Sequence, residues 1–133
     1  MRARGISHSS SLSTMAVEIM FKLAEGAVMP VKATSGSAAY DIYALTETIL
    51  LPKQVTLVRT GLSWAAPRGY CMEIWGRSGN EIKGLVRVAG LVDADYRGEI
   101  KVAIFNHTDE PITLPGGERF AQALIKRIPE VYL

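Results

Sequence analysis

The sequence has a single cysteine, Cys71, and only two histidines, His8 and His107. One cysteine cannot form an internal disulfide, and these three residues lack the spacing of a protein-ligated zinc site. Because a free cysteine is usually buried and inert, we expect Cys71 to be a packed structural thiol in a reducing compartment. These scarcities exclude a disulfide-stabilised scaffold and argue against zinc chemistry.

No apolar run approaches the roughly 20 residues of a membrane-spanning helix, and no basic stripe interleaved with aromatic residues occurs. The chain carries 15 Lys and Arg against 13 Asp and Glu, so its formal net charge is only +2. We therefore expect neither a membrane nor a nucleic-acid polymer as partner. A small anionic ligand, which needs only one or two well-placed cations, fits this balance.

With 133 residues, 48% of them hydrophobic and 21% charged, the chain has the size and composition of one globular domain. We place that domain at residues 17–133. Residues 1–16 contain Arg2, Arg4 and several serines but no acid, which favours a flexible leader and faintly resembles a transit peptide. We expect the protein inside the cell, in the cytoplasm or nucleus, with mitochondrial targeting as the alternative.

Short runs rich in β-branched and aromatic residues, separated by turn residues, predict strands. They lie at 17–23, 40–45, 48–51, 55–62, 70–75, 99–106, 112–114 and 120–128. Only the last run also has a helical period, since Leu124, Ile125 and Ile128 would share one face of a helix. Runs spaced in this way are typical of an all-β sandwich or barrel.

The tripeptide Arg77-Ser78-Gly79 offers groups that suit a phosphate. The arginine gives a forked cation, the serine a hydroxyl donor, and the glycine lets backbone N–H groups approach an anion closely. By itself, however, such a tripeptide is more often an ordinary turn at the end of a strand.

Asp93 and Asp95 follow an apolar pair and precede a glycine turn at Gly98, which superficially resembles the start of a calcium loop. An EF-hand needs an oxygen ligand where Arg97 stands and a glutamate where Ile104 stands, so calcium is excluded. The two acids alone could be solvated hairpin residues or catalytic carboxylates.

Four segments, taken in order, resemble the sequential motifs of trimeric dUTPases. They read Ser-Ala-Ala-Tyr-Asp-Ile-Tyr-Ala at 37–44, Gly-Arg-Ser-Gly at 76–79, Gly-Leu-Val-Asp-Ala-Asp-Tyr-Arg-Gly at 90–98 and Gly-Glu-Arg-Phe-Ala-Gln at 117–122. The resemblance covers residues 18–128. It implies a distorted jelly-roll-like β fold and a homotrimer with active sites at subunit interfaces. It also implies Mg²⁺-dependent hydrolysis of dUTP to dUMP and pyrophosphate.

The resemblance implies that one segment of the chain, the hairpin that ends near Gly98, both carries the catalytic acid and binds the nucleoside. Asp93 is expected to be the general base that orients and deprotonates the attacking water, an effect of about 10²–10⁴-fold. Tyr96 is expected to pack beneath the deoxyribose, where a ribose hydroxyl would be crowded. Backbone groups of the hairpin are expected to read the uracil, at Ala89, Gly90, Leu91 and Val92.

The other motifs are expected to serve the triphosphate. The resemblance implies that Arg77, Ser78 and the Gly79 N–H hold phosphate oxygens. Gln122 would assist at the α-phosphate or its water. Asp41 would lie near the Mg²⁺ ion and act through coordinated water, as is typical of a hard ion that keeps its hydration shell.

The chain departs from the family pattern beside the phosphate segment. Gly76 stands where the family usually has proline, and Asn80-Glu81 stands where it has Leu-Ala. A glutamate so near a triphosphate has no explanation at the sequence level. The family's fifth motif, a glycine-rich tail with an arginine and an aromatic residue, is also absent from this chain. We expect that such a mobile tail belongs to the full protein.

Two other functions are compatible with the sequence. A catalytically impaired dUTPase-like scaffold could use Val131-Tyr132-Leu133 as a ligand for a PDZ groove. A dCTP deaminase shares the fold, although the Arg-Ser-Gly and Asp-Tyr-Arg-Gly segments fit dUTPase better. Asn106-His107-Thr108 matches the glycosylation sequon, which we interpret as a chance match without a secretory signal.

Overall fold

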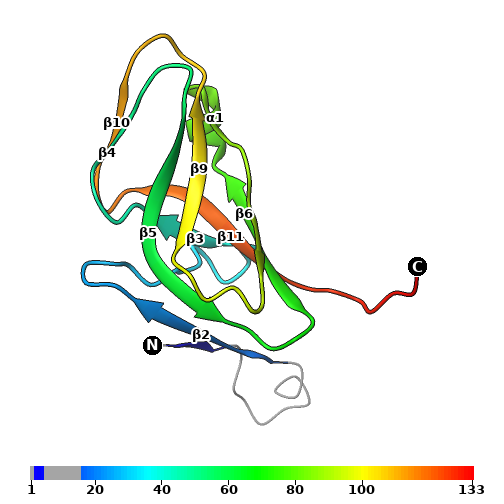
Figure 1. The fold of residues 1–133 in the computed structure, drawn as a ribbon. Coiled ribbons are helices and arrows are strands. Elements are labelled where there is room, and N and C mark those ends of the chain that lie inside the picture. The colour runs from blue at the N-terminus through cyan, green and yellow to red at the C-terminus, as the bar shows by residue number, and fades with distance from the viewer. Residues whose placement is uncertain (1, 5–15) are drawn as a thin grey trace.

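The computed structural model describes residues 2–4 and 16–133, and their regular secondary structure is almost entirely β-strand (Figure 1). Within them, one sheet has the order β1-β2-β5-β9-β7, a second has the order β3-β11-β6-β8, and β10 and β4 form a ribbon. Every pairing is antiparallel. The bounds are β1 (Arg2–Arg4), β2 (Glu18–Leu23), β3 (Tyr40–Tyr43), β4 (Thr48–Leu50), β5 (Val55–Ala65), β6 (Tyr70–Gly76), α1 (Ser78–Ile82), β7 (Leu85–Arg87), β8 (Leu91–Asp93), β9 (Ile100–Asn106), β10 (Ile112–Leu114) and β11 (Arg119–Arg127).

The core forms between the sheets because the strands alternate buried and exposed residues. On β9, Ile100, Val102 and Ile104 are buried while Lys101 is exposed, which is the period of a strand with one wet face. The largest fully buried side chains are Trp64, Phe120, Ile42, Leu50, Leu62 and Met72. The all-β class predicted from the sequence is confirmed.

Each of the eight predicted runs contains a strand, with ends that differ by a few residues. The ambiguous run at 120–128 is strand β11 and not a helix, because β11 pairs with β3 on one edge and with β6 on the other. The pattern of strand runs did not predict β1, β7 and β8, which have three residues each, or the five-residue helix α1, and β8 was expected only as part of the hairpin in the motif at 90–98. Elements this short carry too few residues for a period to emerge.

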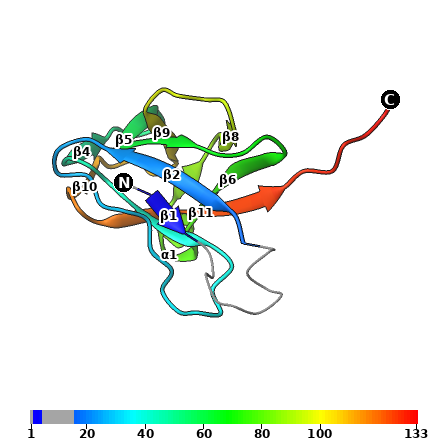
Figure 2. The same cartoon turned by 90° about the horizontal axis from the view of Figure 1, so that it is seen from below.

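Part of the expected leader is paired in the structure. Arg2–Arg4 forms β1, which lies antiparallel to β2 with Arg4 opposite Glu18, and Figure 2 shows the two strands together. The rest of the leader, at residues 1 and 5–15, lies outside the described residues. No helix in the described residues is long and apolar enough to cross a membrane.

Cys71 and Asn106 are structural residues. Cys71 is free and buried, and burial raises the pKa of its thiol, as expected for a packed and unreactive cysteine. Asn106 is completely buried, and its amide Nδ2 donates to the carbonyls of Leu50 and Glu110 at 2.8 Å each. Its Oδ1 accepts from the backbone N–H and the hydroxyl of Thr108. The sequon asparagine is therefore inaccessible in the folded domain.

A candidate active site in two halves

The predicted base-reading hairpin is an edge strand. β8 pairs with β6 on one side only and ends the four-stranded sheet, so its other edge presents backbone N–H and C=O groups. The Ile74 N–H donates to the Gly90 carbonyl at 2.6 Å, and a Cβ at Gly90 would lie 2.5 Å from the Ile74 carbonyl oxygen. Only glycine permits this approach, which holds the hairpin against β6.

Asp93 opens onto a pocket of about 510 Å³. Its backbone carbonyl accepts from the Trp64 indole N–H at 3.0 Å and from the Tyr96 N–H at 3.1 Å, while its side chain is exposed. The backbone is thus fixed and the carboxylate is accessible. The pocket is lined by Leu57, Leu91, Val92, Asp93, Tyr96, Glu99, Ile100 and Lys101.

Tyr96 lines the same pocket and is 45% exposed. Its hydroxyl donates to the Glu99 carbonyl at 2.9 Å. The ring leaves no room for a side chain at Gly98, where a Cβ would lie 2.9 Å from Tyr96 Cζ. The structure therefore brings Asp93, Leu91, Val92 and Tyr96 to one pocket, with Gly90 behind them on the hairpin. Ala89 is exposed at the start of that hairpin.

The predicted phosphate segment is an open turn at the end of β6. Arg77 caps α1 and its guanidinium Nη1 approaches the Arg119 carbonyl at 3.4 Å, while Ser78 and Gly79 are exposed. The Asn80 amide donates to the Phe120 carbonyl at 2.9 Å and ties the turn to β11. This bond explains the asparagine at 80, one of the two departures after the Ser-Gly pair.

Asp41 and Gln122 lie opposite each other on β3 and β11 and line a pocket of about 390 Å³ together with Trp75. The Gln122 amide donates to the Gly76 carbonyl at 3.0 Å, which fixes it beside the phosphate turn. Asp41 Oδ2 pairs with Arg119 Nη1 at 3.3 Å, and only 13% of the Asp41 side chain is exposed. The structure thus groups the predicted phosphate and metal residues along one end of the sheet.

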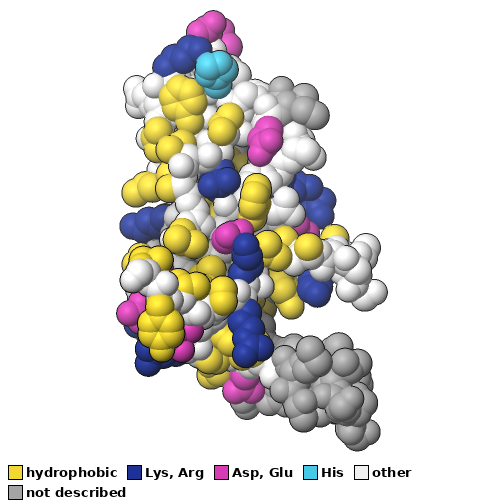
Figure 3. Space-filling view, turned by 90° about the vertical axis from the view of Figure 1, so that its right-hand side faces the viewer, with side chains coloured by type: hydrophobic (Ala, Val, Ile, Leu, Met, Phe, Trp, Pro, Cys, Tyr) yellow, Lys and Arg dark blue, Asp and Glu magenta, His cyan; other side chains and the backbone are white. Residues whose placement is uncertain are grey.

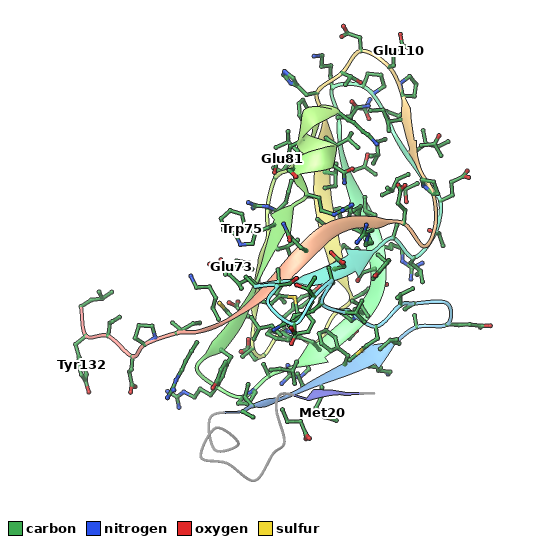
Figure 4. All side chains as sticks on the ribbon, turned by 180° about the vertical axis from the view of Figure 1, so that it is seen from behind. Met20, Glu73, Trp75, Glu81, Glu110 and Tyr132 are labelled. Atoms are coloured by element: carbon green, nitrogen blue, oxygen red, sulfur yellow. The ribbon has the colours of Figure 1, made fainter. Side chains whose placement is uncertain are left out.

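The two remaining departures, Gly76 and Glu81, fit each other. A Cβ at Gly76 would lie 2.6 Å from Glu81 Oε1, so the glutamate carboxylate fills the space beside the Gly76 Cα. Figure 4 shows Glu81, Trp75 and Glu73 one after another along the same side of the molecule. Glu81 is therefore a packing partner of the glycine.

The two halves are far apart within one chain. β8 and β3 are opposite edges of the sheet, so three strand spacings separate Asp93 from Asp41. The two residues also differ in position along the strands. Asp93 lies opposite Cys71 of β6, whereas Asp41 lies opposite Gln122 of β11, which in turn lies opposite Trp75 of β6, four residues after Cys71. With about 4.8 Å between strands and 3.3 Å per residue, the two Cα atoms lie roughly 20 Å apart. Arg77, two residues beyond Trp75, is similarly distant from Asp93.

Sequence reasoning missed Trp75 and Arg87. The Arg87 guanidinium stacks over the Trp75 ring, with Cζ 5.5 Å from the ring centroid. Both residues line a pocket of about 260 Å³ with Gly90 and Leu91, behind the hairpin. Arg87 Nε is buried and has no hydrogen-bond partner within the described part of the chain. Nothing in the sequence signals this pair, because Arg87 lies on the unpredicted strand β7.

The described residues contain no group of three or more His, Cys, Asp and Glu side chains that could hold a metal ion. At the phosphate half, Asp41 is the acidic residue among those that line the pocket of about 390 Å³. Because Mg²⁺ keeps several waters and is commonly held by one or two carboxylates plus substrate phosphates, this donor set fits such an ion.

Comparison with known proteins gives consistent matches. A model of the dUTPase family matches residues 25–132. The deoxyuridine 5'-triphosphate nucleotidohydrolase of Debaryomyces hansenii is 40% identical over 110 residues, which cover 82% of this chain and 69% of that protein. The protein of the same name from Treponema denticola is 43% identical over 114 residues, which cover 82% of this chain and 79% of that protein.

Solved structures share the fold. The Staphylococcus bacteriophage 80alpha dUTPase matches with a TM-score of 0.79 and 26% identity over 86% of this chain and 93% of that chain. A dUTPase from phage phi11 of S. aureus, described with a structural Mg(II) ion, matches with a TM-score of 0.79 and 24% identity over 86% and 94%. The jelly-roll-like fold expected from the sequence is thereby confirmed.

Proposed function

The chain belongs to the dUTPase family, and from this premise we propose that it hydrolyses dUTP to dUMP and pyrophosphate. The observation that carries the proposal is the edge strand β8. Its free backbone edge suits a nucleobase, and it ends in the exposed carboxylate of Asp93 at a pocket shared with Tyr96. Base recognition and water activation thus come from one short segment.

The hairpin selects uracil by its backbone pattern. Backbone groups on the free edge of the hairpin, at Ala89, Gly90, Leu91 and Val92, pair with the polar edge of the base, and a tight hairpin excludes the thymine methyl. Cytosine inverts the donor and acceptor at ring position four and would leave buried backbone groups unpaired. A mismatch of this kind discriminates by about 10⁴–10⁵-fold.

Asp93 acts as the general base. Its carboxylate is accessible while its carbonyl is held by Trp64 and Tyr96, so the acid can orient a water against a bound nucleotide. It accepts the proton as the water oxygen attacks the α-phosphorus, and pyrophosphate leaves. Tyr96 packs its ring beneath the deoxyribose, where an added 2′-hydroxyl would lose its water without gaining a partner.

Arg77, Ser78 and the Gly79 N–H hold phosphate oxygens at the open turn after β6, and Gln122 assists at the α-phosphate. Asp41 anchors Mg²⁺ through water. When bound, the ion neutralises charge on the triphosphate that would repel the incoming nucleophile. The structural Mg(II) ion described for the phi11 dUTPase supports a metal in this family.

The active site is completed by a second copy of the chain in a homotrimer. A triphosphate is too short to reach both Asp93 and Arg77 across roughly 20 Å of one sheet, so the phosphate half must come from a neighbouring subunit. Trp75 is 49% exposed and Leu91 is 70% exposed beside the hairpin, as expected for a surface that a partner covers. Figure 3 shows hydrophobic patches between charged side chains on the side of the molecule it views.

A pyrophosphate-release assay with dUTP, dTTP, dCTP and UTP tests the proposal. We expect Mg²⁺-dependent turnover of dUTP alone, and we expect Asp93→Asn to bind nucleotide while losing about 10²–10⁴-fold in kcat. Asp109→Asn makes the same charge change at an exposed site far from the pocket and should retain activity. Ammonia release from dCTP would favour the deaminase alternative. An intracellular location remains part of the proposal, in keeping with the free thiol of Cys71.

A further inference from the structure

A bidentate ion pair lies beside the nucleoside pocket. Arg59 Nη2 donates to Glu99 Oε1 at 2.8 Å, and Arg59 Nε donates to Glu99 Oε2 at 3.0 Å. The Gly61 N–H adds a third donor to Oε2 at 3.3 Å. The Arg59 hydrogen bond outweighs burial and holds the pKa of Glu99 below its usual range. A forked arginine and a backbone N–H together fix both oxygens of this carboxylate.

A β-bulge in β5 makes this arrangement possible. The register between β5 and β9 shifts between Arg59 and Leu62, and Gly61 has a φ of +72°. The shift turns the Gly61 N–H away from the ladder and towards the Glu99 carboxylate. A Cβ at Gly61 would lie 2.8 Å from the Cβ of Ala27, so a larger residue fits poorly here. The anchor point of Glu99 is therefore a rigid feature of the central strand.

Glu99 is also the residue that holds Tyr96. Its carbonyl accepts the Tyr96 hydroxyl at 2.9 Å, and the ring of Tyr96 lies against Gly98. Tyr96 is otherwise half exposed at the end of a turn, where a tyrosine would have several rotamers. The position of its ring thus depends on where the Glu99 backbone is fixed.

We propose that the Arg59–Glu99 pair is a positioning device that fixes Tyr96 against the sugar and so sets the preference for deoxyribonucleotides over ribonucleotides. The inference rests on the proposed function, in which Tyr96 packs beneath the deoxyribose. The Arg59 side chain is 51% exposed and that of Glu99 is 23% exposed, so the pair contributes little to stability. The pair therefore affects the selectivity between deoxyribonucleotides and ribonucleotides.

The test compares kcat/KM for dUTP and UTP in wild type, Glu99→Ala, Glu99→Gln, Arg59→Met and Arg59→Lys. We expect Glu99→Ala and Arg59→Met to lower the dUTP-to-UTP ratio about fivefold to tenfold, largely through KM. Gln and Lys each retain part of the fork and should give intermediate ratios. Asp109→Asn, which removes a charge from the exposed pair with Lys53, should leave the ratio unchanged. All variants should keep a Tm within a few degrees of wild type, about the shift expected for an exposed pair.

A double-mutant cycle separates positioning from general damage. Tyr96→Phe removes the hydroxyl that bonds to the Glu99 carbonyl, so its effect on the ratio and that of Glu99→Ala should be clearly less than additive. Full additivity, or a ratio within twofold of wild type in Glu99→Ala, would overturn the inference while selective dUTP hydrolysis by wild type still stands. Absence of dUTP hydrolysis by wild type would instead overturn the proposed function and this inference with it.

Discussion

An assembly that contains two inactive variants, Asp93→Asn and Arg77→Ala, tests whether each active site combines residues from two chains. The roughly 20 Å between these positions in one chain follows from one strand spacing of about 4.8 Å, at right angles to six residues of about 3.3 Å each from Cys71 of β6 to Arg77 just beyond its end. If each site combines Asp93 of one subunit with Arg77 of the next, the mixed assembly contains sites in which both residues are intact. If both residues acted within one chain, no mixed site would be intact.

The expected recovery follows from the symmetry. In every cyclic trimer that contains both variants, one of the three ordered neighbouring pairs joins an intact Asp93 to an intact Arg77, so about 33% of the sites are intact. The parent variants should each retain about 1% of wild-type activity or less, because losing a general base costs about 10²–10⁴-fold and losing one phosphate donor about 10²–10³-fold. Mixing should therefore raise activity more than about tenfold above either parent.

The assay measures pyrophosphate release after the two variants are co-expressed with different affinity tags and purified through both tags. Assemblies that pass both columns contain both chains, so a failure of subunit mixing cannot mimic a negative result. Two differently tagged copies of Asp93→Asn, purified in the same way, serve as the control and should remain inactive. Activity of the mixed assembly no higher than that of its parents would refute the interface site.

Two further changes probe the packing beside the site. Gly76→Ala and Glu81→Ala should be coupled by about 0.5–1 kcal/mol in urea unfolding, because only with Glu81 present does the new Cβ displace a carboxylate. Gly36→Ala, which meets nothing within 4 Å, is the control, and additive effects would contradict the packing. Asn106→Ala should cost about 2–4 kcal/mol, because it leaves the buried Leu50 carbonyl and the Thr108 N–H unpaired and removes one of the two donors to the Glu110 carbonyl, whereas exposed Gln54→Ala should stay within about 0.5 kcal/mol. A cost for Asn106→Ala as small as that of the control would contradict the network.

Much of the fold could be predicted from the sequence, because the longer strands carry a period-two pattern that survives in the structure. β9 alternates buried and exposed residues along its length, and its turn residues are visible in the chain. The run that forms β11 is ambiguous in the sequence because apolar residues occupy both of its faces, so that the consecutive residues Phe120 and Ala121 are both buried. β8 was found through its motif and not through its pattern, since three residues show no period.

The residues of the candidate site could likewise be predicted only in part. Asp93 and the Arg77-Ser78-Gly79 segment were predicted through the resemblance of their segments to a family, since each by itself is compatible with an ordinary turn. Arg59 and Glu99 could not be predicted, because forty residues separate them and a β-bulge at Gly61 brings them together. The packing of Glu81 against Gly76 could not be predicted either, because it depends on the helix α1, which places the Glu81 side chain beside the end of β6.

If Asp93 and Arg77 act on one nucleotide as proposed, the arrangement of the sheet makes assembly a condition of catalysis. In the proposed function the edge of β8 reads the base because no further strand among the described residues covers it, and the same edge position places β8 three strand spacings from β3. No rotamer change can carry Asp93 across that distance, since a side chain reaches only a few ångströms from its backbone. A single chain can therefore bind a nucleoside or a phosphate but cannot aim water at the bond between them. Dilution into monomers should abolish turnover while leaving each half folded, so specific activity should fall with protein concentration.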